Sequence, residues 1–528
     1  MDVRSSSPFR EKGIIAGLSA VFITWAERIY RGSGLSRRVA GLAAECRRIA
    51  GKSDLWRFFF RPERSTLFLN SSAAGRIMNA GERLSLRGLR AAGRRLESSL
   101  TGRFLASAAA HTAWITGTFV LIQTIVPHQY WFNIFNLVLS GLVFLLYLVR
   151  CATDRSEQAT LSPLKLDTAM LIFFLAGAMA AVTSLHLRDS LRIFTLNLIP
   201  LLVVFVIVNG LKTLRDLERF MWLTVTGVTV ASLYGFAQYA MGIEVDQRLV
   251  DTVVSGSIRR LFSTMGNPNN FGEYLVLTLP LYAALFLNGK TIRMKLLVAG
   301  LALLPLGNLF LTSSRSSWLG LVFAGGIFLF MTYRKLLPLL LLGGLLAIPV
   351  LPDSIRQRIG TIGRDSSSQY RVIIWKGAFR MLGDYWLTGT GQGPAPFMAL
   401  FPRYSTLRDV VHSHMLPLQI WLETGLAGIL SFLWMMGRLF KKVAGGAAVT
   451  ENRSESDNAI RRIRAAAFAG MAGLLFIGIF EYVWFYPRIL SMFWILAGLL
   501  MAALAVHPSS IPGGDADAGA VSRSHAGS

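Results

Sequence analysis

Cysteine, histidine and acidic residues are all scarce in this sequence. Its 528 residues include two cysteines, Cys46 and Cys151, and this number excludes a disulfide framework. Neither cysteine lies near a histidine cluster, so the spacing of a zinc site is missing and we expect neither a metal nor another cofactor. A cleavable secretory signal is not predicted either, because the first apolar segment, residues 13–25, is short and leads into Glu27 and Arg28.

Acidic side chains are about half as common as basic ones, 29 against 54, and the formal net charge is +25. Such a charge could indicate a nucleic-acid partner, but no basic helix interleaved with aromatic residues occurs on a soluble domain. In membrane proteins Lys and Arg accumulate in cytoplasmic loops, and some of the excess contacts anionic lipid or a polyanionic substrate. We therefore expect membrane lipids, and no nucleic acid, as partners.

Apolar residues are abundant: 53% of the chain is hydrophobic and 16% is charged. Uncharged runs of about 20 residues recur, which is the length that crosses a hydrocarbon core as a helix. These runs are continuous, whereas the strands of a membrane barrel alternate between apolar and polar residues. The sequence therefore predicts an all-α, polytopic integral membrane protein.

Twelve spans are predicted, and the charges of their connecting loops set the orientation. With the N-terminus inside, the short inside loops hold eighteen Lys and Arg and the short outside segments hold seven. This bias predicts that both termini are cytoplasmic. The predicted spans are 104–126, 130–149, 167–186, 191–209, 219–241, 271–287, 293–312, 316–333, 335–351, 414–437, 464–484 and 487–506.

The spans divide the chain into three regions. Residues 1–103 form a basic cytoplasmic extension, interpreted either as amphipathic helices on the membrane surface or as a partly disordered tail. Residues 104–506 form the transmembrane domain, and 507–528 a flexible cytoplasmic tail. Within the domain, residues 352–413 form a large outer loop between spans nine and ten, and loops of this length usually carry function.

Four polar stretches fall on the outer face of this topology. "RRLFSTMGNPNNFGEYL" (259–275) precedes span six, and "LTSSRSSWLG" (311–320) joins spans seven and eight. "YRVIIWKGAFRMLGDYWLTGTGQGPAPF" (370–397) lies in the large loop, and "HSHMLPLQIWLETGLAG" (412–428) enters span ten. An Arg in a tight outer turn, Arg315, either meets an anionic partner or anchors the helix end at the interface.

These four stretches, in this order, resemble the superfamily of O-antigen ligases and O-antigen polymerases, which are bacterial membrane glycosyltransferases. The elements that carry the resemblance are "GNPNNF" after an Arg, "SSRS" before a span, "LTGTGQG" in the outer loop, and "ETGLAG" after a His. The resemblance covers roughly residues 104–506. It implies a GT-C-like fold in the bacterial plasma membrane with its active site on the extracytoplasmic face.

The resemblance also implies the reaction, which is a metal-independent, inverting transfer of a polysaccharide from undecaprenyl diphosphate to an acceptor hydroxyl on a lipid or a saccharide. Arg260 and Arg315 match the arginine positions of the family and are expected to bind the diphosphate, with Arg371 as a third candidate. Arginine suits this role because its planar fork donates paired, charge-assisted hydrogen bonds to phosphate.

Two histidines compete for the role of the base that the acceptor hydroxyl needs. His414 is followed by Gly425 and Gly428 at the spacing of the family, but its neighbour Met415 departs from the pattern. His412 has the expected Ser413 beside it but lacks the glycine spacing. We expect His414 to be the general base, with His412 as the second choice.

Three more residues are expected to support the site. Gln419 and Glu423 fall where the family has them, and Glu423 either serves catalysis or bonds an arginine of another helix. Asn269 is expected to shape the turn before span six. Ligase and polymerase activity remain alternatives, and a polysaccharide or lipid transporter is a rival from another class, although the two halves of the chain show no internal repeat.

Overall fold

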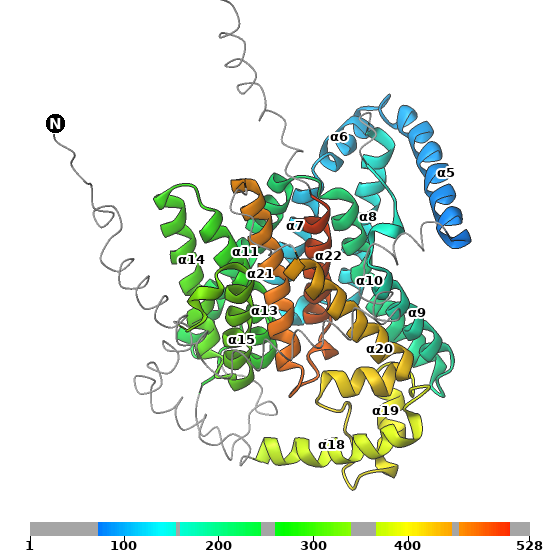
Figure 1. The fold of residues 1–528 in the computed structure, drawn as a ribbon, viewed down its shortest axis with the longest axis vertical. Coiled ribbons are helices and arrows are strands. Elements are labelled where there is room, and N and C mark those ends of the chain that lie inside the picture. Colours follow the sequence, from blue (N-terminus) through cyan, green and yellow to red (C-terminus); the bar gives the residue numbers. More distant parts are fainter. Residues whose placement is uncertain (1–71, 155–158, 244–258, 339–365, 446–453, 507–528) are drawn as a thin grey trace, which may run out of the picture.

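A computed structural model describes residues 72–154, 159–243, 259–338, 366–445 and 454–506. Throughout these ranges the regular elements are α-helices and short 3-10 turns, so the predicted all-α class is confirmed (Figure 1). The predicted tail 507–528 and most of the N-terminal extension lie outside the described residues, as does most of the predicted span 335–351.

Eight helices of the described part are long and apolar enough to cross a membrane, so the protein is polytopic. They include only part of the twelve predicted spans, and that number stays a prediction. In chain order the eight are α8 (Asn133–Thr153), α10 (Leu187–Gly210), α11 (Leu214–Ala240), α13 (Pro268–Asn288), α14 (Ile292–Leu311), α15 (Arg315–Thr332), α20 (Leu416–Gly445) and α22 (Pro487–Ala505).

Three predicted spans have a different form in the structure. The span 104–126 is a pair of helices, α6 (Leu100–Ala109) and α7 (Thr112–Ile125), that meet at a bend of 77°. The span 167–186 is the 15-residue helix α9 (Thr168–Val182). The span 464–484 is α21 (Glu455–Ile477), which ends seven residues before the predicted end.

Helix α21 starts in a charged segment and ends before the predicted span does, at the C-cap residue Gly478. Its first half carries three arginines that bond the ends of neighbouring helices; for example, Arg464 donates to the Ala503 carbonyl and Arg462 to the Leu287 carbonyl. At its other end, Gly478 is the C-cap, and its carbonyl accepts a hydrogen bond of 2.7 Å from the Leu416 amide at the start of α20. The chain therefore leaves the helix beside α20, and residues 478–486 form a turn.

Helices α13, α21 and α22 lie in the middle of the bundle (Figure 1). Of the 18 most apolar consecutive residues in each helix, 83% are buried in α13 and 89% in α22, whereas 22% are buried in α14. Asn267 caps α13 by accepting a hydrogen bond from the Asn269 amide, and Pro268 occupies its first turn, where a missing N–H costs nothing. The start of α13 is thus fixed beside Arg260 and the turn that follows it.

The predicted outer loop, 352–413, contains helices of its own. Residues 352–365 lie outside the described part, but α18 (Ser366–Tyr385) and α19 (Pro394–Leu400) pack together at one end of the bundle, below α20 (Figure 1). Their small core joins Ile374, Met381 and Phe397 to Leu418 and Leu422 of α20. The loop is therefore anchored on α20, the helix that begins directly after the histidines.

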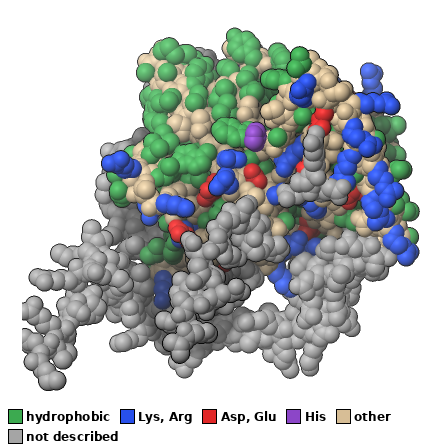
Figure 2. Space-filling model, turned by 90° about the horizontal axis from the view of Figure 1, so that it is seen from above, with side chains coloured by type: hydrophobic (Ala, Val, Ile, Leu, Met, Phe, Trp, Pro, Cys, Tyr) green, Lys and Arg blue, Asp and Glu red, His purple; other side chains and the backbone are tan. Residues whose placement is uncertain are grey.

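The opposite end of the bundle carries α5 (Ala73–Leu96), a strongly amphipathic helix with Arg94 and Arg95 in its last turn. Lys and Arg side chains gather along this end, most densely at the edge where α5 lies (Figure 2). The predicted boundary at residue 103 falls inside α6, because Ser99 caps a helix that already begins at Leu100. The bundle thus has a basic end, and α18 and α19 lie at the other.

Candidate active site

The site is built on a break in α20. Gly425 has φ +66°, a left-handed conformation inside the helix, and the loop "GTGQG" (389–393) packs against this break. Three backbone hydrogen bonds join the two segments: Thr390 N to Leu422 O at 2.7 Å, Gly391 N to Glu423 O at 3.2 Å, and Leu426 N to Leu387 O at 3.2 Å. The loop thereby satisfies helix backbone groups that the break leaves without their intrahelical partners.

Glycine is required at the point of closest approach. A Cβ on Gly389, which has φ +73°, would lie 2.6 Å from the backbone nitrogen of Gly425, and a Cβ on Gly425 would overlap the Leu387 carbonyl. Gly389 and Gly425 therefore serve close backbone packing, and no Lys-Ser or Lys-Thr pair follows the loop as it would in a phosphate-binding P-loop.

The histidine loop enters α20 in a strained conformation. His414 has φ +51°, which is uncommon for a residue with a side chain. The Ser413 amide donates to Gln419 Oε1 at 2.7 Å, the His414 amide to His412 Nδ1 at 3.3 Å, and Trp375 Nε1 to the His414 carbonyl at 3.4 Å. These contacts hold the strained residue in one orientation, which is how strain is retained at functional sites.

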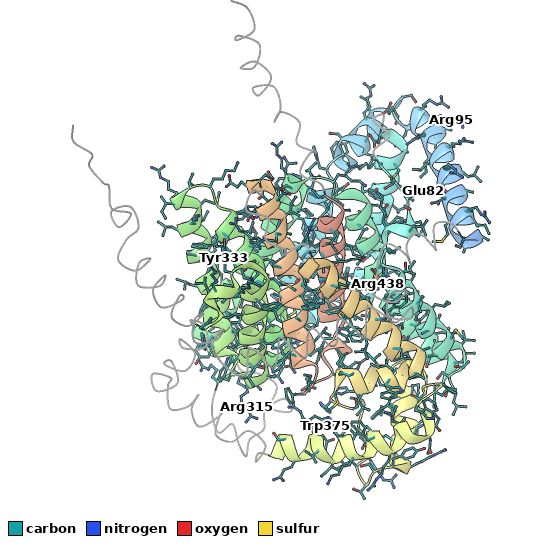
Figure 3. All side chains as sticks on the ribbon, in the orientation of Figure 1. Glu82, Arg95, Arg315, Tyr333, Trp375 and Arg438 are labelled. Carbon is teal, nitrogen blue, oxygen red and sulfur yellow. The ribbon has the colours of Figure 1, made fainter. Side chains whose placement is uncertain are left out.

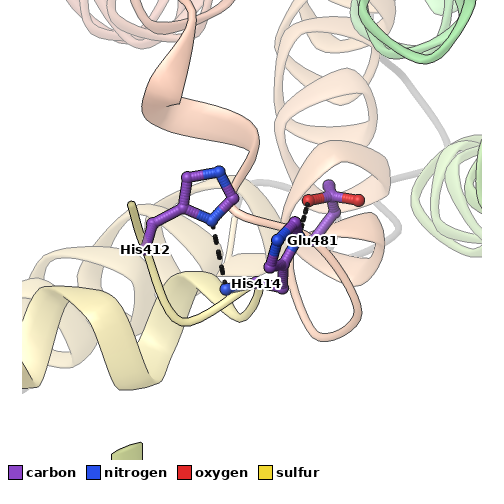
Figure 4. A group of neighbouring side chains, drawn as sticks. All are labelled: His412, His414 and Glu481. Carbon is purple, nitrogen blue, oxygen red and sulfur yellow. Dashed lines mark hydrogen bonds and ion pairs between the residues drawn. The ribbon is translucent and has the colours of Figure 1, made fainter. Parts of the chain in front are cut away.

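The two histidines meet a carboxylate from the turn after α21. His414 Nδ1 lies 2.8 Å from Glu481 Oε1, and the rings of His412 and His414 are 4.2 Å apart (Figure 4). Glu481 Oε2 also pairs with Arg371 of α18 at 2.7 Å. Side chains from the outer loop, from the entry to α20 and from the 478–486 turn therefore converge on one carboxylate.

The charges of this cluster follow from its contacts. Burial opposes ionisation of Glu481, but the hydrogen bond from His414 and the charge of Arg371 outweigh it and lower its pKa to about 2. Burial, together with the neighbouring His414, lowers the pKa of His412 to about 3, so His412 is neutral near pH 7. Because ionised Glu481 can only accept, His414 donates from Nδ1, and its Nε2 is the nitrogen that can take a proton.

Gln419 and Glu423 support this arrangement from one turn to the next of α20. Gln419 uses its oxygen for the Ser413 amide and its Nε2 to donate to Glu423 Oε1 at 2.9 Å. The same oxygen of Glu423 also accepts from the Gly393 amide and from the Tyr482 hydroxyl, each at 3.4 Å. Glu423 is thus 7% exposed and bonded to three segments, none of them through an arginine. A cavity of about 40 Å³ adjoins it.

The expected diphosphate-binding arginines form a separate group. Arg260 donates from Nε to the Thr312 carbonyl at 2.9 Å and from its terminal nitrogen to Asn269 Oδ1 at 2.6 Å. Asn269 therefore orients Arg260 besides shaping the turn. Thr312 is three residues before Arg315, which begins α15. Arg315 lies at the same end of the molecule as Trp375, which bonds the histidine loop (Figure 3).

Arg371 belongs with the histidines rather than with this arginine group, because its partner is Glu481. In the described residues, no direct hydrogen bond or ion pair joins Arg260 or Arg315 to the histidine cluster. Glu273 of α13, which is 2% exposed, lies within electrostatic range of both Glu481 and Arg371. Glu273 is one helical turn beyond Asn269, which bonds Arg260. The start of α13 therefore lies between the arginine group and the histidine cluster.

Glu481 and Glu273 were not found from the sequence. The sequence does carry a signal for each of them, because a carboxylate within a predicted membrane span is usually paired or functional. Glu481 fell in the predicted span 464–484 and Glu273 in the span 271–287. Only the folded arrangement shows that Glu481 pairs with Arg371 and that Glu273 lies within its electrostatic range; Arg371 is about a hundred residues away from each of them in the sequence.

The donor atoms of His412, His414 and Glu481 lie within 4.8 Å of one another, a spacing that could hold a metal ion. The described structure already gives two of these donors another role: Glu481 binds Arg371, and His412 Nδ1 accepts from the His414 amide. Arg371 would also repel a bound cation. The expectation that the site needs no metal stays a prediction.

Part of the site lies in a segment that is similar to a known family. Residues 300–433 match the sequence model of the O-antigen ligase family. The chain carries an O-antigen ligase domain. No curated protein matches the chain. Within the O-antigen ligase match lie Arg315, Arg371, both histidines and Glu423, whereas Arg260 and Glu481 lie outside it.

Proposed function

We propose that the protein is a membrane glycosyltransferase that moves a polysaccharide from undecaprenyl diphosphate to an acceptor hydroxyl at the outer face of the bacterial plasma membrane. The single observation that carries the proposal is the His414–Glu481 pair, at 2.8 Å, inside a chain with an O-antigen ligase domain. A histidine oriented by a carboxylate is the arrangement that removes a proton from a hydroxyl nucleophile.

In the proposed reaction the acceptor oxygen attacks the anomeric carbon of the donor sugar from the face opposite the diphosphate. The bond between that carbon and the diphosphate oxygen breaks, and the diphosphate leaves with the electron pair. The hydroxyl proton passes to His414 Nε2, and Glu481 stabilises the imidazolium that forms. The attack inverts the configuration at the anomeric carbon, and no step requires a metal.

Arg260 and Arg315 are proposed to bind the diphosphate, whose negative charge grows as the bond breaks. The Asn269 contact supports this role, because it fixes one edge of the Arg260 guanidinium. Arg371 holds Glu481 and adds positive charge beside the histidines. The general base is assigned to His414 rather than to His412, because His412 is 7% exposed and its Nδ1 is occupied by the His414 amide.

A ligase transfers the glycan to a lipid-linked core, and a polymerase transfers it to the next glycan unit. The spacing from His414 to Gly425 and Gly428, which resembles that of the ligases, favours the ligase. Deleting the gene separates the two: a ligase leaves long chains on undecaprenyl diphosphate, and a polymerase leaves short repeats. Loss of neither length nor attachment would contradict both and would favour a transporter.

The proposal is tested with purified protein, lipid-linked donor and acceptor. His414→Ala is expected to lower transfer by at least about a thousandfold, within the range of general base catalysis and orientation. His412→Ala removes a hydrogen bond to one backbone amide, worth about 1 kcal/mol, and is expected to keep more than a tenth of the activity. Transfer that survives His414→Ala would remove the assigned base.

Two further measurements test how the diphosphate is bound and whether the reaction needs a metal ion. Arg315→Lys is expected to lower transfer nearly as much as Arg315→Ala, because an ammonium group cannot form the paired hydrogen bonds of a guanidinium. Full activity with Lys would contradict bidentate binding. Transfer is also expected to persist in excess chelator; a loss that added divalent metal restores would show that the His412, His414 and Glu481 group holds an ion.

A further inference from the structure

Arg488 is a buried cation without an acidic partner in the described part of the chain. It lies in the first turn of α22 and is 7% exposed. One terminal nitrogen donates to the Thr264 carbonyl at 3.2 Å, and the guanidinium lies over the Trp131 ring at 5.0 Å. Its other terminal nitrogen is buried and has no hydrogen-bond partner among the described residues.

A second buried donor lies on the neighbouring helix α7. Gln123 is fully buried, and its oxygen accepts from the Ser491 hydroxyl at 2.8 Å, while its amide nitrogen has no hydrogen-bond partner in the described residues. Ser491 is three residues after Arg488, so both lie on one face of α22. Tyr274 of α13 adjoins both groups, because it interacts electrostatically with Arg488 and its hydroxyl lies within hydrogen-bonding reach of the Gln123 side chain.

The polarity of this cluster is that of an anion site. Both unpartnered groups are N–H donors, and the positive end of the α22 dipole lies beside them. The N-cap residue of that helix, Tyr486, gives no side-chain cap that would offset the dipole. A buried guanidinium is costly unless an anion compensates it, and a charge kept inside a membrane protein usually marks a ligand.

The cluster adjoins both groups of the proposed active site. Thr264, which holds Arg488, is four residues after Arg260 in the same turn. On the other side, the ring of Phe485, three residues before Arg488, lies 4.9 Å from the His412 ring. A phosphate at Arg488 would therefore lie beside Thr264, which is close to Arg260 in the sequence, and near Phe485, which contacts His412.

We propose that Arg488, assisted by the Gln123 amide, binds a phosphate group of the isoprenyl diphosphate. This inference rests on the proposed function, because it assigns a binding residue for the same donor. It gives the diphosphate a protein contact from α22, in addition to those expected from Arg260 and Arg315. Arg488 binds substrate in this view, and the Thr264 bond only orients it.

The test measures binding of farnesyl diphosphate to the purified full-length protein, with farnesol and inorganic pyrophosphate as comparison probes. Arg488→Gln is expected to weaken farnesyl diphosphate binding at least tenfold and to leave the weak binding of farnesol unchanged. The matched control is Arg259→Gln, because Arg259 is an exposed arginine that bonds the Tyr239 carbonyl and stacks on the Tyr239 ring. Unchanged binding by Arg488→Gln would overturn the proposal.

A second variant covers the case in which Arg488→Gln fails to fold. Gln123→Glu places a carboxylate beside Arg488, so it should preserve or raise the melting temperature while it abolishes diphosphate binding. Normal binding by Gln123→Glu would overturn the proposal, and so would equal competition by phosphatidylglycerol, which would show a headgroup site. Glycan transfer by the wild-type protein is measured separately and reports on the proposed function. If the protein transfers glycan but its diphosphate binding does not depend on Arg488, only the inference is refuted. If binding depends on Arg488 but the protein transfers no glycan, only the proposed function is refuted.

Discussion

Replacing Glu481 by Gln tests whether the carboxylate acts through His414. The substitution keeps the size and the polarity of the side chain but removes its charge. A pKa lowered from 4.5 to about 2 corresponds to about 3 kcal/mol of favourable interaction between ionised Glu481 and its neighbours. His414 and Arg371 share that energy, so the part available to a catalytic imidazolium is about 2 kcal/mol. We expect kcat to fall between about tenfold and a hundredfold.

The assay is the initial rate of glycan transfer at varied donor and acceptor concentrations, with Glu455→Gln as the control. Glu455 is an exposed glutamate in the first turn of α21, at the opposite end of that helix from the turn that carries Glu481. The Michaelis constants should change little in Glu481→Gln, because the effect acts on the transition state. A fall in kcat of less than threefold, or a rise in the Michaelis constants alone, would refute the assignment.

Three further predictions concern stability. Gly425→Ala should lower the free energy of unfolding by at least about 2 kcal/mol, from the left-handed backbone and the steric overlap; Gly300→Ala, where a Cβ meets open space, is the control for a melting curve in detergent. The pKa of His412 falls from 6.5 to about 3 on folding, so below pH 6.5 the unfolded chain binds a proton that the folded one does not, and the wild type should lose up to about 1.4 kcal/mol of stability per pH unit. A His412→Gln protein that keeps the same pH dependence would contradict the burial of His412. Asp167→Asn should cost about 3 to 5 kcal/mol, since it leaves Arg438, 1% exposed, without the carboxylate that it contacts at 3.1 Å; an unchanged melting temperature would contradict this.

The membrane helices could be predicted because their signal is local. Each needs only a long apolar run, and the predicted starts of α11, α13, α14 and α22 fall within about five residues of the observed ones. The histidine loop was also predictable in position, because polar residues at the mouth of an apolar run are conspicuous. The bend between α6 and α7 was not, since neither Pro nor Gly marks the break, which falls at Ala110 and His111.

The interior of the site depends on contacts between distant segments, which no local pattern reveals. Arg371 resembles a phosphate ligand in the sequence, yet it pairs with Glu481, 110 residues away. Gly425 was noted only as a spacing marker for the histidine, and its left-handed conformation depends on a loop that precedes it by more than thirty residues. Pairing of this kind is set by the fold as a whole.

The break in α20 has a consequence for how such proteins can recombine. The loop 389–393 completes the backbone hydrogen bonding of the helix around Gly425, so each segment is a structural part of the other. A chimaera with its outer loop from one parent and the following span from another would separate these halves, even if both parents had the same chemistry. Exchange of acceptor specificity between relatives should therefore succeed when residues 387–426 move together and fail when a crossover falls between them.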